Sequence, residues 1–172
     1  MKKYGILVGR FQPFHIGHLQ AVRFALGKVK TLWIIIGSAQ KSHEPRNPFT
    51  AGERLAMIKA TLDANKIDPK RWYTIPVYDA EVHSMWTGQI DMLVPEYDVV
   101  FTNDAFTKML FKKRRKQVAA VPMLKRRFLS GTEVRRRIAN DGNWKELVPR
   151  QVAQIISKVD GVERIKLLLH PK

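Results

Sequence analysis

The feature that most constrains this chain is the stretch GILVGRFQPFHIGHL at residues 5–19. A short aliphatic run is broken by glycine, arginine and proline and then resumes with helical spacing, which is typical of a buried strand that turns directly into a helix. Gly9 and Gly17 let the backbone approach a ligand closely. The first turn of the helix offers unpaired N–H groups at the positive end of its dipole. The sequence therefore predicts a phosphate site at this turn.

Two histidines, His15 and His18, lie at the entrance of this helix. Each imidazole can donate a hydrogen bond to a phosphate oxygen, so the pair can bind one phosphate group from two sides, His15 from the loop and His18 from the helix. A lone histidine beside a glycine-rich turn is more often structural, but two within the string HIGH are hard to attribute to chance. We take both as candidate phosphate ligands.

Strand and helix patterns alternate along the rest of the chain, and residues 31–36 form an unbroken apolar strand that suits a parallel sheet covered on both faces. This pattern predicts an α/β fold of the Rossmann-like, doubly wound kind, with a parallel five-stranded sheet and helices on both faces. We expect a single domain over residues 1–172, with a helical tail from about residue 148 that packs on the sheet or on another subunit. The other expected helices include residues 17–28, 51–65, 84–92 and 131–140, and the later strands cover residues 73–77, 97–102 and 118–121.

Three further polar or aromatic residues, Asp79, Trp86 and Asn103, follow predicted strands. Ligands of doubly wound sheets bind beyond the carboxyl ends of the strands, so these residues are expected near the same crevice as the histidines. Ser84 is expected to cap the helix that contains Trp86. Asn103 can hold a ribose or phosphate, or it can start the next helix, which is the more common role. A tryptophan near a helix start is more often core than ligand platform.

A second motif, LSGTEVRRRI, occupies residues 129–138. Ser130 and Glu133 alone make a capping box, which is a purely structural interpretation. Hydroxyls, a glycine and an arginine at a helix N-terminus also suit a triphosphate. Helical spacing places Arg136 opposite the apolar face, whereas Arg135 and Arg137 flank that face and Arg135 is closer to the helix start.

The charge balance points to anionic partners. The chain has 31 lysines and arginines against 15 acidic residues, a net charge of +16, which suits either polyphosphate nucleotides or nucleic acid. The basic run at residues 112–116 is expected to be a solvated surface segment, because five adjacent charges cannot all face one pocket. A nucleic-acid patch is the alternative, although no aromatic residue is interleaved in the run to stack bases. Cysteine is absent and no apolar stretch approaches the length of a membrane span, so we expect a cytoplasmic protein without a membrane partner.

Residues 9–18, GRFQPFHIGH, resemble the HxGH signature of the nucleotidyltransferase superfamily in the form found in nicotinamide-nucleotide adenylyltransferases. Residues 130–135 resemble the SxTxxR motif of that superfamily, with Arg135 in the arginine position and Gly131 in place of the usual second serine. The segment at residues 37–54 is similar to a loop of the archaeal enzymes, in which the arginine that matches Arg46 contacts a substrate phosphate. The resemblance spans residue 5 to about residue 166.

This resemblance implies that the phosphate of nicotinamide mononucleotide attacks the α-phosphorus of ATP, giving NAD and pyrophosphate. It implies His15, His18 and Arg135 as catalytic residues, and a homo-oligomer, with a hexamer as one form. Mg²⁺ is expected to arrive with ATP, and no metal site of the protein itself is expected. The residues expected to bind ATP are Gly9, Arg10, Phe11, Gly17, Ser130, Thr132 and Arg135, and those expected to bind nicotinamide mononucleotide are Arg46, Asp79, Trp86 and Asn103.

The choice of acceptor rests on the segments at residues 9–14 and 46–54 and on Trp86, rather than on the two phosphate motifs. An indole face is the best natural partner for a cationic pyridinium ring, so Trp86 is expected to stack on it, while Asp79 binds a sugar hydroxyl or reinforces that charge. Flavin mononucleotide or pantetheine phosphate is the alternative acceptor. Class I aminoacyl-tRNA synthetases share the HxGH element, but the chain is short and has no KMSKS-like loop. From a different class, a basic RNA-binding module on a nucleotide fold is the alternative.

Overall fold

The computed structural model describes residues 2–122 and 129–170. Its centre is one five-stranded sheet in which each neighbouring pair is parallel and the order is β3-β2-β1-β4-β5. This architecture confirms the predicted doubly wound α/β fold, with the order of strands changing direction at β1 and β4. The strands are β1 (Lys2–Gly9), β2 (Val29–Ile36), β3 (Trp72–Pro76), β4 (Val99–Phe101) and β5 (Gln117–Ala119).

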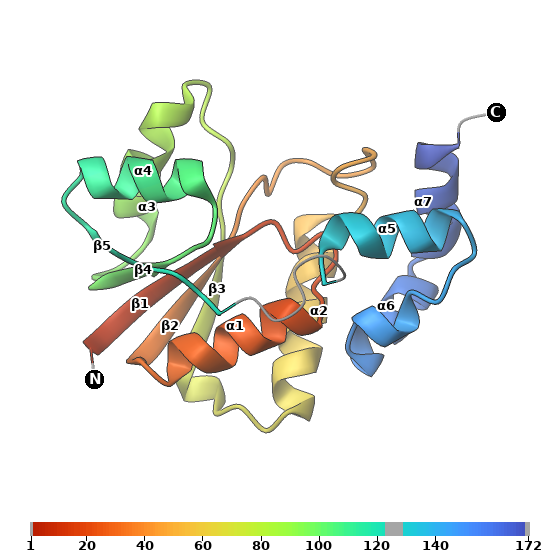
Figure 1. Ribbon diagram of the computed structural model, residues 1–172, viewed down its shortest axis with the longest axis horizontal. Coiled ribbons are helices and arrows are strands. Elements are labelled where there is room, and N and C mark those ends of the chain that lie inside the picture. The colour runs from red at the N-terminus through yellow and green to blue at the C-terminus, as the bar shows by residue number, and fades with distance from the viewer. Residues whose placement is uncertain (1, 123–128, 171–172) are drawn as a thin grey trace.

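Helices cover both faces of the sheet. Figure 1 shows α1 and α2 on one face and α3 and α4 on the other. A larger core lies under the first pair and a smaller core under the second. The helices are α1 (Ile16–Leu26), α2 (Ala51–Ala64), α3 (Trp86–Leu93), α4 (Ala105–Lys113), α5 (Gly131–Ala139), α6 (Arg150–Lys158) and α7 (Gly161–Leu169).

The unit from β1 through α1 to β2 is the most regular part of the fold. Leu7 of β1 pairs with Ile34 of β2 on one side and with Phe101 of β4 on the other, which makes β1 a central strand. Leu19 and Val22 of α1 are buried against this strand layer, as their helical spacing predicts. The end of β1 and the start of α1 are therefore fixed on a rigid, desolvated base.

Two capping predictions are wrong. Ser84 does not cap α3, because residues 83–85 form a 3₁₀ turn and Met85 is the residue that precedes the helix. Asn103 does not start α4, because the Asp104 carboxylate accepts the Thr107 N–H at 2.7 Å and lies one residue closer to the helix. The side chain of Asn103 is thereby left for another contact.

The C-terminal tail, which was expected to pack on the sheet or on another subunit, makes its main contacts within the chain with other helices. Helix α6 contacts α2, and α7 contacts α5 and α6. Arg164 of α7 pairs with Glu53 at 2.8 Å and donates to the carbonyl of Pro48 at 3.1 Å, so α7 is tied to the start of α2. No helix in the described ranges is long and apolar enough to cross a membrane.

Candidate active site

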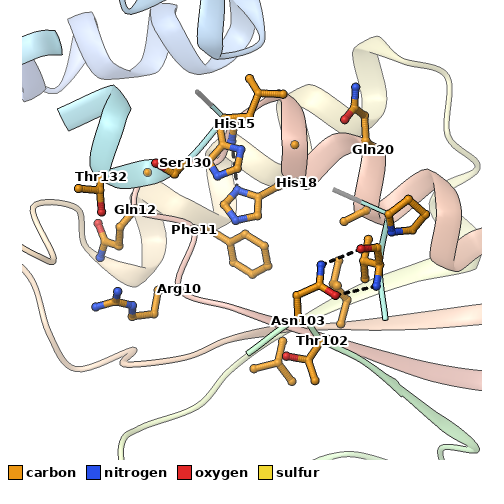
Figure 2. A pocket seen from close by; sticks show the side chains of 18 of the residues that line it. Arg10, Phe11, Gln12, His15, His18, Gln20, Thr102, Asn103, Ser130 and Thr132 are labelled. Carbon is orange, nitrogen blue, oxygen red and sulfur yellow. Dashed lines mark hydrogen bonds between the residues drawn. The ribbon is translucent and has the colours of Figure 1, made fainter. Parts of the chain in front are cut away.

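A cavity of about 320 Å³ lies where the carboxyl ends of β1 and β4 meet the N-terminal ends of α1 and α5 (Figure 2). We call it the central cavity. It brings together two motifs that are more than a hundred residues apart in the sequence. The residues expected from the sequence that line it are Arg10, Phe11, His15, Gly17, His18, Asn103, Ser130, Thr132 and Arg135, while Gly9, Arg46, Asp79 and Trp86 are not part of its lining.

The turn between β1 and α1 is tightly packed. Phe11 has a positive φ of 53° although it is not a glycine, and its ring is 1% exposed. A Cβ atom at Gly9 would lie 2.7 Å from the Cζ atom of Phe11, and one at Gly17 would lie 3.0 Å from the Cε1 atom of His15. Both glycines are therefore required by neighbouring rings, and Gly9 acts through Phe11 rather than as part of the cavity wall.

Gln12 is a member of this turn that the sequence analysis missed. Its side-chain amide donates to the Phe49 carbonyl at 2.8 Å and accepts the Phe49 N–H at 2.9 Å, and the residue is 4% exposed. This double hydrogen bond fixes the loop before α2 against the phosphate turn. The signal available in the sequence was the position of Gln12 between Phe11 and Phe14. An amide that is buried beside such rings requires hydrogen-bond partners.

The two histidines form a stacked pair at the start of α1. Their ring centroids lie 3.6 Å apart, and the backbone N–H of His15 donates a hydrogen bond to the ring atom Nδ1 of His18 at 3.2 Å. Figure 2 shows both imidazoles between Ser130 and Asn103. Because Nδ1 of His18 accepts a hydrogen bond, its Nε2 atom carries the proton in the neutral form and can donate to a ligand. Nδ1 of His15 is buried and has no partner among the described residues.

Both histidines are neutral at physiological pH. Burial lowers the pKa of His15 to about 4. Burial, and then the neighbouring His15, lower the pKa of His18 well below its usual value. A bound phosphate opposes these shifts, because a nearby negative charge favours the protonated imidazole. The pair can therefore gain positive charge as an anion enters.

These shifts predict a pH dependence of stability. Because the folded pKa of His15 lies below its ordinary value of 6.5, the unfolded chain binds more protons between these values. The free energy of unfolding should fall as the pH drops below about 6.5, by about 2 kcal/mol from His15 alone between about pH 7 and about pH 5. Urea denaturation across this range measures the effect. His15→Asn should flatten the curve, and an unchanged slope in that variant would contradict the assignment.

Helix α5 supplies the opposite wall of the central cavity. Oγ of Ser130 accepts the Glu133 N–H at 3.1 Å, so Ser130 caps α5 and keeps its own O–H available as a donor. The other half of the expected capping box is absent, because the Glu133 carboxylate pairs with Arg136 and Arg137 at 2.8 Å. These ion pairs hold the pKa of Glu133 at about 2.

Arg135 is the arginine of α5 that reaches the central cavity. It is 7% exposed, donates to the carbonyl of Gln12 at 2.7 Å and reaches Oγ1 of Thr132 at 3.3 Å. A Cβ atom at Gly131 would lie 2.8 Å from that same carbonyl. The glycine that replaces the usual serine therefore lets α5 approach the phosphate turn closely enough for Arg135 to bridge them.

Positive charge is concentrated around this bridge. Burial, followed by Arg10 and Arg46, lowers the pKa of Arg135 to about 10. Burial, followed by Arg46, also lowers the pKa of Arg10. The mutual repulsion of three guanidinium groups beside two buried imidazoles favours occupation by an anion with several negative charges.

Arg54 is a second residue that the sequence analysis missed. It is 0% exposed and donates to the carbonyls of Arg10, Gly37 and Ser38 at 2.8–3.1 Å, so it joins the ends of β1 and β2. The signal was its spacing, because positions 54, 58 and 62 share the apolar stripe of α2. A charged residue on that stripe indicates a buried cation with fixed partners.

A second depression lies beside the central cavity and shares Arg10 with it. We call it the loop hollow; its lining includes Arg46 together with Ser38 and Lys41. Asp79 adjoins it, because its carboxylate accepts the Ser38 hydroxyl at 2.9 Å and lies 3.5 Å from Lys41. Arg46 and Asp79 are thus brought together at this hollow, next to the phosphate turn.

Asn103 and Trp86 occupy different surroundings. The Asn103 amide exchanges two hydrogen bonds with the backbone of Val121, at 2.7 and 3.0 Å, and lines the central cavity from the side of β4. Trp86 is 7% exposed in the smaller core, with its ring edge-to-face on Phe111 at 6.3 Å. The structure brings it neither to the central cavity nor to the loop hollow, and its stacking on a ligand stays a prediction.

The donor set of the site suits phosphates. In the part of the chain that the structure describes, no group of three or more histidine, cysteine, aspartate or glutamate side chains is placed to hold a metal ion. Imidazole, hydroxyl, guanidinium and backbone N–H groups are all donors to anionic oxygen. The arrangement can bind a polyphosphate and stabilise charge that develops on it.

Comparison with known proteins agrees with this geometry. Residues 6–137 match the model of the cytidylyltransferase-like family. The chain is 44% identical over 168 residues, 98% of its length, to a protein of Thermococcus kodakarensis named nicotinamide-nucleotide adenylyltransferase, of which it covers 89%. The chain belongs to the nicotinamide-nucleotide adenylyltransferase family. Another member, from Thermoplasma volcanium, is 40% identical over 94% of this chain and 90% of its own length.

Solved structures show the same fold at lower identity. A bifunctional NMN adenylyltransferase/ADP ribose pyrophosphatase from Francisella tularensis, complexed with AMP and a manganese ion, superposes with a TM-score of 0.83 at 22% identity. The match covers 98% of this chain and 52% of that longer protein. The likeness shows that this chain has the same fold as about half of that longer protein.

Proposed function

We propose that this chain transfers the adenylyl group of ATP to nicotinamide mononucleotide, giving NAD and pyrophosphate. The observation that carries the proposal is the meeting of two phosphate-binding helix starts, those of α1 and α5, in one cavity bridged by Arg135. The names of the relatives, at 40–44% identity over nearly the whole chain, support nicotinamide mononucleotide as the acceptor.

The proposed reaction is a direct displacement at the α-phosphorus. A phosphate oxygen of the mononucleotide forms the new P–O bond, the bond to the bridging oxygen breaks, and pyrophosphate leaves with the electron pair. The second pKa of a phosphate monoester is about 6, so the nucleophile is ionised at neutral pH without a general base. Catalysis then depends on alignment and on stabilisation of developing charge.

The donors of the central cavity divide between the two ends of the triphosphate. We assign His15 and His18 to the α-phosphate and the bridging oxygen. His15 is the N-cap residue of α1 and His18 lies in its first turn, just beyond the end of β1. Arg135, with Ser130 and Thr132, would hold the leaving β- and γ-phosphates at the start of α5. Mg²⁺ enters as part of the substrate, as its complex with ATP.

The loop hollow is assigned to the acceptor. Arg46 would contact its phosphate, and Asp79 its sugar hydroxyl or the positive charge of its ring, while Arg10, which lines both this hollow and the central cavity, stays assigned to ATP. The proximity of these residues to the phosphate turn supports the assignment. Contacts from Asn103 and Trp86 to the acceptor remain predictions from the sequence.

The proposal includes the setting of the enzyme. Residues 1–172 would act as one nucleotidyltransferase domain, in the cytoplasm, as a homo-oligomer such as a hexamer. The length of the chain supports the first expectation, its lack of cysteine the second, and the resemblance to the family the third. Sedimentation velocity over a range of protein concentrations measures the oligomeric state, and a monomer at every concentration would contradict the last of them.

Pyrophosphate release from ATP and Mg²⁺ tests the reaction. Nicotinamide mononucleotide, nicotinic acid mononucleotide, flavin mononucleotide and pantetheine phosphate are supplied separately, and the dinucleotide product is identified by mass. We expect turnover with nicotinamide mononucleotide. Turnover with flavin mononucleotide or pantetheine phosphate alone would keep the phosphate chemistry and reject the acceptor, and no turnover with any of the four would favour a binding module.

A further inference from the structure

A row of aromatic rings crosses three neighbouring strands and shares no residue with the lining of the central cavity. Tyr4 of β1, Trp33 of β2 and Tyr73 of β3 lie on one face of the sheet, and we call them the aromatic row. The ring centroids of Tyr4 and Trp33 are 6.1 Å apart at an interplanar angle of 27°, and those of Trp33 and Tyr73 are 5.1 Å apart at 33°. The row lines a surface depression bounded by Pro95 and Glu96.

The row ends at an open edge of the sheet. In the strand order β3 is the outer strand, so no strand lies beyond Tyr73, whose side chain is 47% exposed. Tyr4 and Trp33 are half-buried at the margin of the smaller core. Aromatic surface grouped in this way on a soluble protein indicates a contact site for another molecule.

Uncompensated positive charge surrounds the same strand starts. Six basic residues lie at the amino ends of β1, β2 and β3, and we call them the basic rim. Within residues 2–122 and 129–170, none of the six forms an ion pair with a carboxylate. The ammonium of Lys3 lies 4.9 Å from the centre of the Tyr4 ring. Arg71 donates to the carbonyls of Leu26, Val29 and Lys30, which fix its position without neutralising it. The basic rim consists of Lys2, Lys3, Lys28, Lys30, Lys70 and Arg71.

Acidic side chains nearby are fewer and partly occupied. The Asp98 carboxylate accepts the N–H groups of Lys3 and Tyr4 at 3.0 and 2.9 Å, and Asp68 accepts the N–H of Lys70 at 2.9 Å. Glu96 borders the aromatic row, and its carbonyl accepts the Trp33 indole N–H at 3.2 Å. The six cations of the basic rim outnumber these three carboxylates.

We propose that the aromatic row and the basic rim together bind single-stranded nucleic acid. Nucleobases are planar rings that stack on aromatic side chains without regard to sequence. Exposed Tyr73 and the accessible parts of Tyr4 and Trp33 offer such a surface, and a row of cations beside them neutralises the phosphates. The site combines the aromatic row on one face of the sheet with the basic rim at the strand starts, has no lining residue in common with the central cavity, and does not depend on the proposed reaction. It uses positive charge that nucleotide binding at the central cavity leaves unused.

The basic run at residues 112–116 is a poorer candidate for the same ligand. Arg114 and Lys116 are both paired with Asp91, and Lys116 also lies over the ring of Tyr97, which is 8% exposed. An anchored cation next to a buried ring offers no stacking surface. The observations therefore favour the strand starts over this helix end.

Tryptophan fluorescence provides a direct readout. Trp72, Trp86 and Trp144 are 7–8% exposed, so a quencher that stacks at the surface reports on Trp33. An oligouridylate of roughly a dozen nucleotides is added with ATP and Mg²⁺ in excess, which keeps the central cavity occupied. We expect saturable quenching, with an association constant that falls between roughly 50 mM and roughly 200 mM salt.

Matched variants locate the site. Tyr73→Leu keeps an apolar side chain but removes the stacking ring, and it should weaken binding about tenfold. Lys3→Glu combined with Lys30→Glu should lower the slope of log K against log salt by about one to two. The control Tyr78→Leu, at an exposed tyrosine beyond the other end of β3, should bind like the original protein. Adenylyl transfer should be unchanged in Tyr73→Leu.

Three results would overturn the proposal. The first is no quenching at roughly 50 mM salt, where a phosphate-dependent site binds most strongly. The second is unchanged binding by Tyr73→Leu together with a loss in Lys112→Ala/Lys113→Ala, which would move the site to α4. The third is a change in Trp33 emission with protein concentration in the absence of oligonucleotide, which would show that a second copy of the chain covers the row.

Discussion

His18→Ala is expected to lower kcat/KM for adenylyl transfer by roughly a hundredfold or more, about 3 kcal/mol of transition-state stabilisation. Nδ1 of His18 accepts a hydrogen bond from the backbone N–H of His15. The other ring nitrogen of His18, Nε2, is therefore a fixed donor in the lining of the central cavity. A preorganised donor contributes most where charge develops during bond breaking, so kcat should fall more than the KM for ATP rises. Pyrophosphate release at saturating nicotinamide mononucleotide measures both constants.

Two companion variants separate the donor from the shape of the side chain. His18→Gln retains an N–H donor at a similar distance and should recover part of the lost activity. His170→Ala, at an exposed histidine that follows α7, should leave kcat/KM unchanged. If His18→Ala retained full activity while His15→Ala lost it, the assignment of the donor would pass to His15.

Arg135→Ala should have the larger effect of the two, a fall in kcat/KM of about a thousandfold, at the upper limit for removal of one preorganised donor. Its guanidinium is 7% exposed, donates to the Gln12 carbonyl at 2.7 Å and is repelled by Arg10 and Arg46. This uncompensated charge is favourable once an anion binds, so the loss should include weaker inhibition by pyrophosphate. Steady-state kinetics with added pyrophosphate measure both effects.

The neighbouring arginine provides a control on the same helix. Arg136 is largely exposed and paired with Glu133, so Arg136→Ala should change neither kcat/KM nor the inhibition by pyrophosphate. Arg135→Lys keeps the charge but not the fork that reaches Gln12 and Thr132, and it should lie between the original protein and Arg135→Ala. Equal activity of Arg135→Ala and Arg136→Ala would remove Arg135 from the mechanism.

The parts of the site that could be predicted are those coded by neighbouring residues. The strand-to-helix turn with His15 and His18, and the capped helix start with Ser130 and Arg135, are short motifs whose spacing carries the chemistry. The doubly wound sheet also follows from local patterns, because apolar strands alternate with amphipathic helices. Local caps were predicted less well, since Asp104 and Met85 precede their helices where Asn103 and Ser84 were expected.

The parts that could not be predicted depend on contacts across the chain. The double hydrogen bond between Gln12 and Phe49 joins residues with no local pattern between them. Arg54 reads as an ordinary helix residue until its spacing with Ile58 and Leu62 is considered together with the strand ends that it joins. For Trp86, composition could not distinguish a stacking platform from a core residue, and the structure places the ring in the smaller core.

The bridge between Arg135 and the Gln12 carbonyl joins positions 123 residues apart. During synthesis the phosphate turn emerges first, and a nascent chain that ends before α5 has only one wall of the nucleotide pocket. Closing so long a loop costs entropy that must be offset by the packing of α5, α6 and α7 on the earlier helices. On the proposed function the nucleotide site is complete only when α5 is docked, so we expect bound nucleotide to stabilise the complete fold over forms in which α5 is undocked.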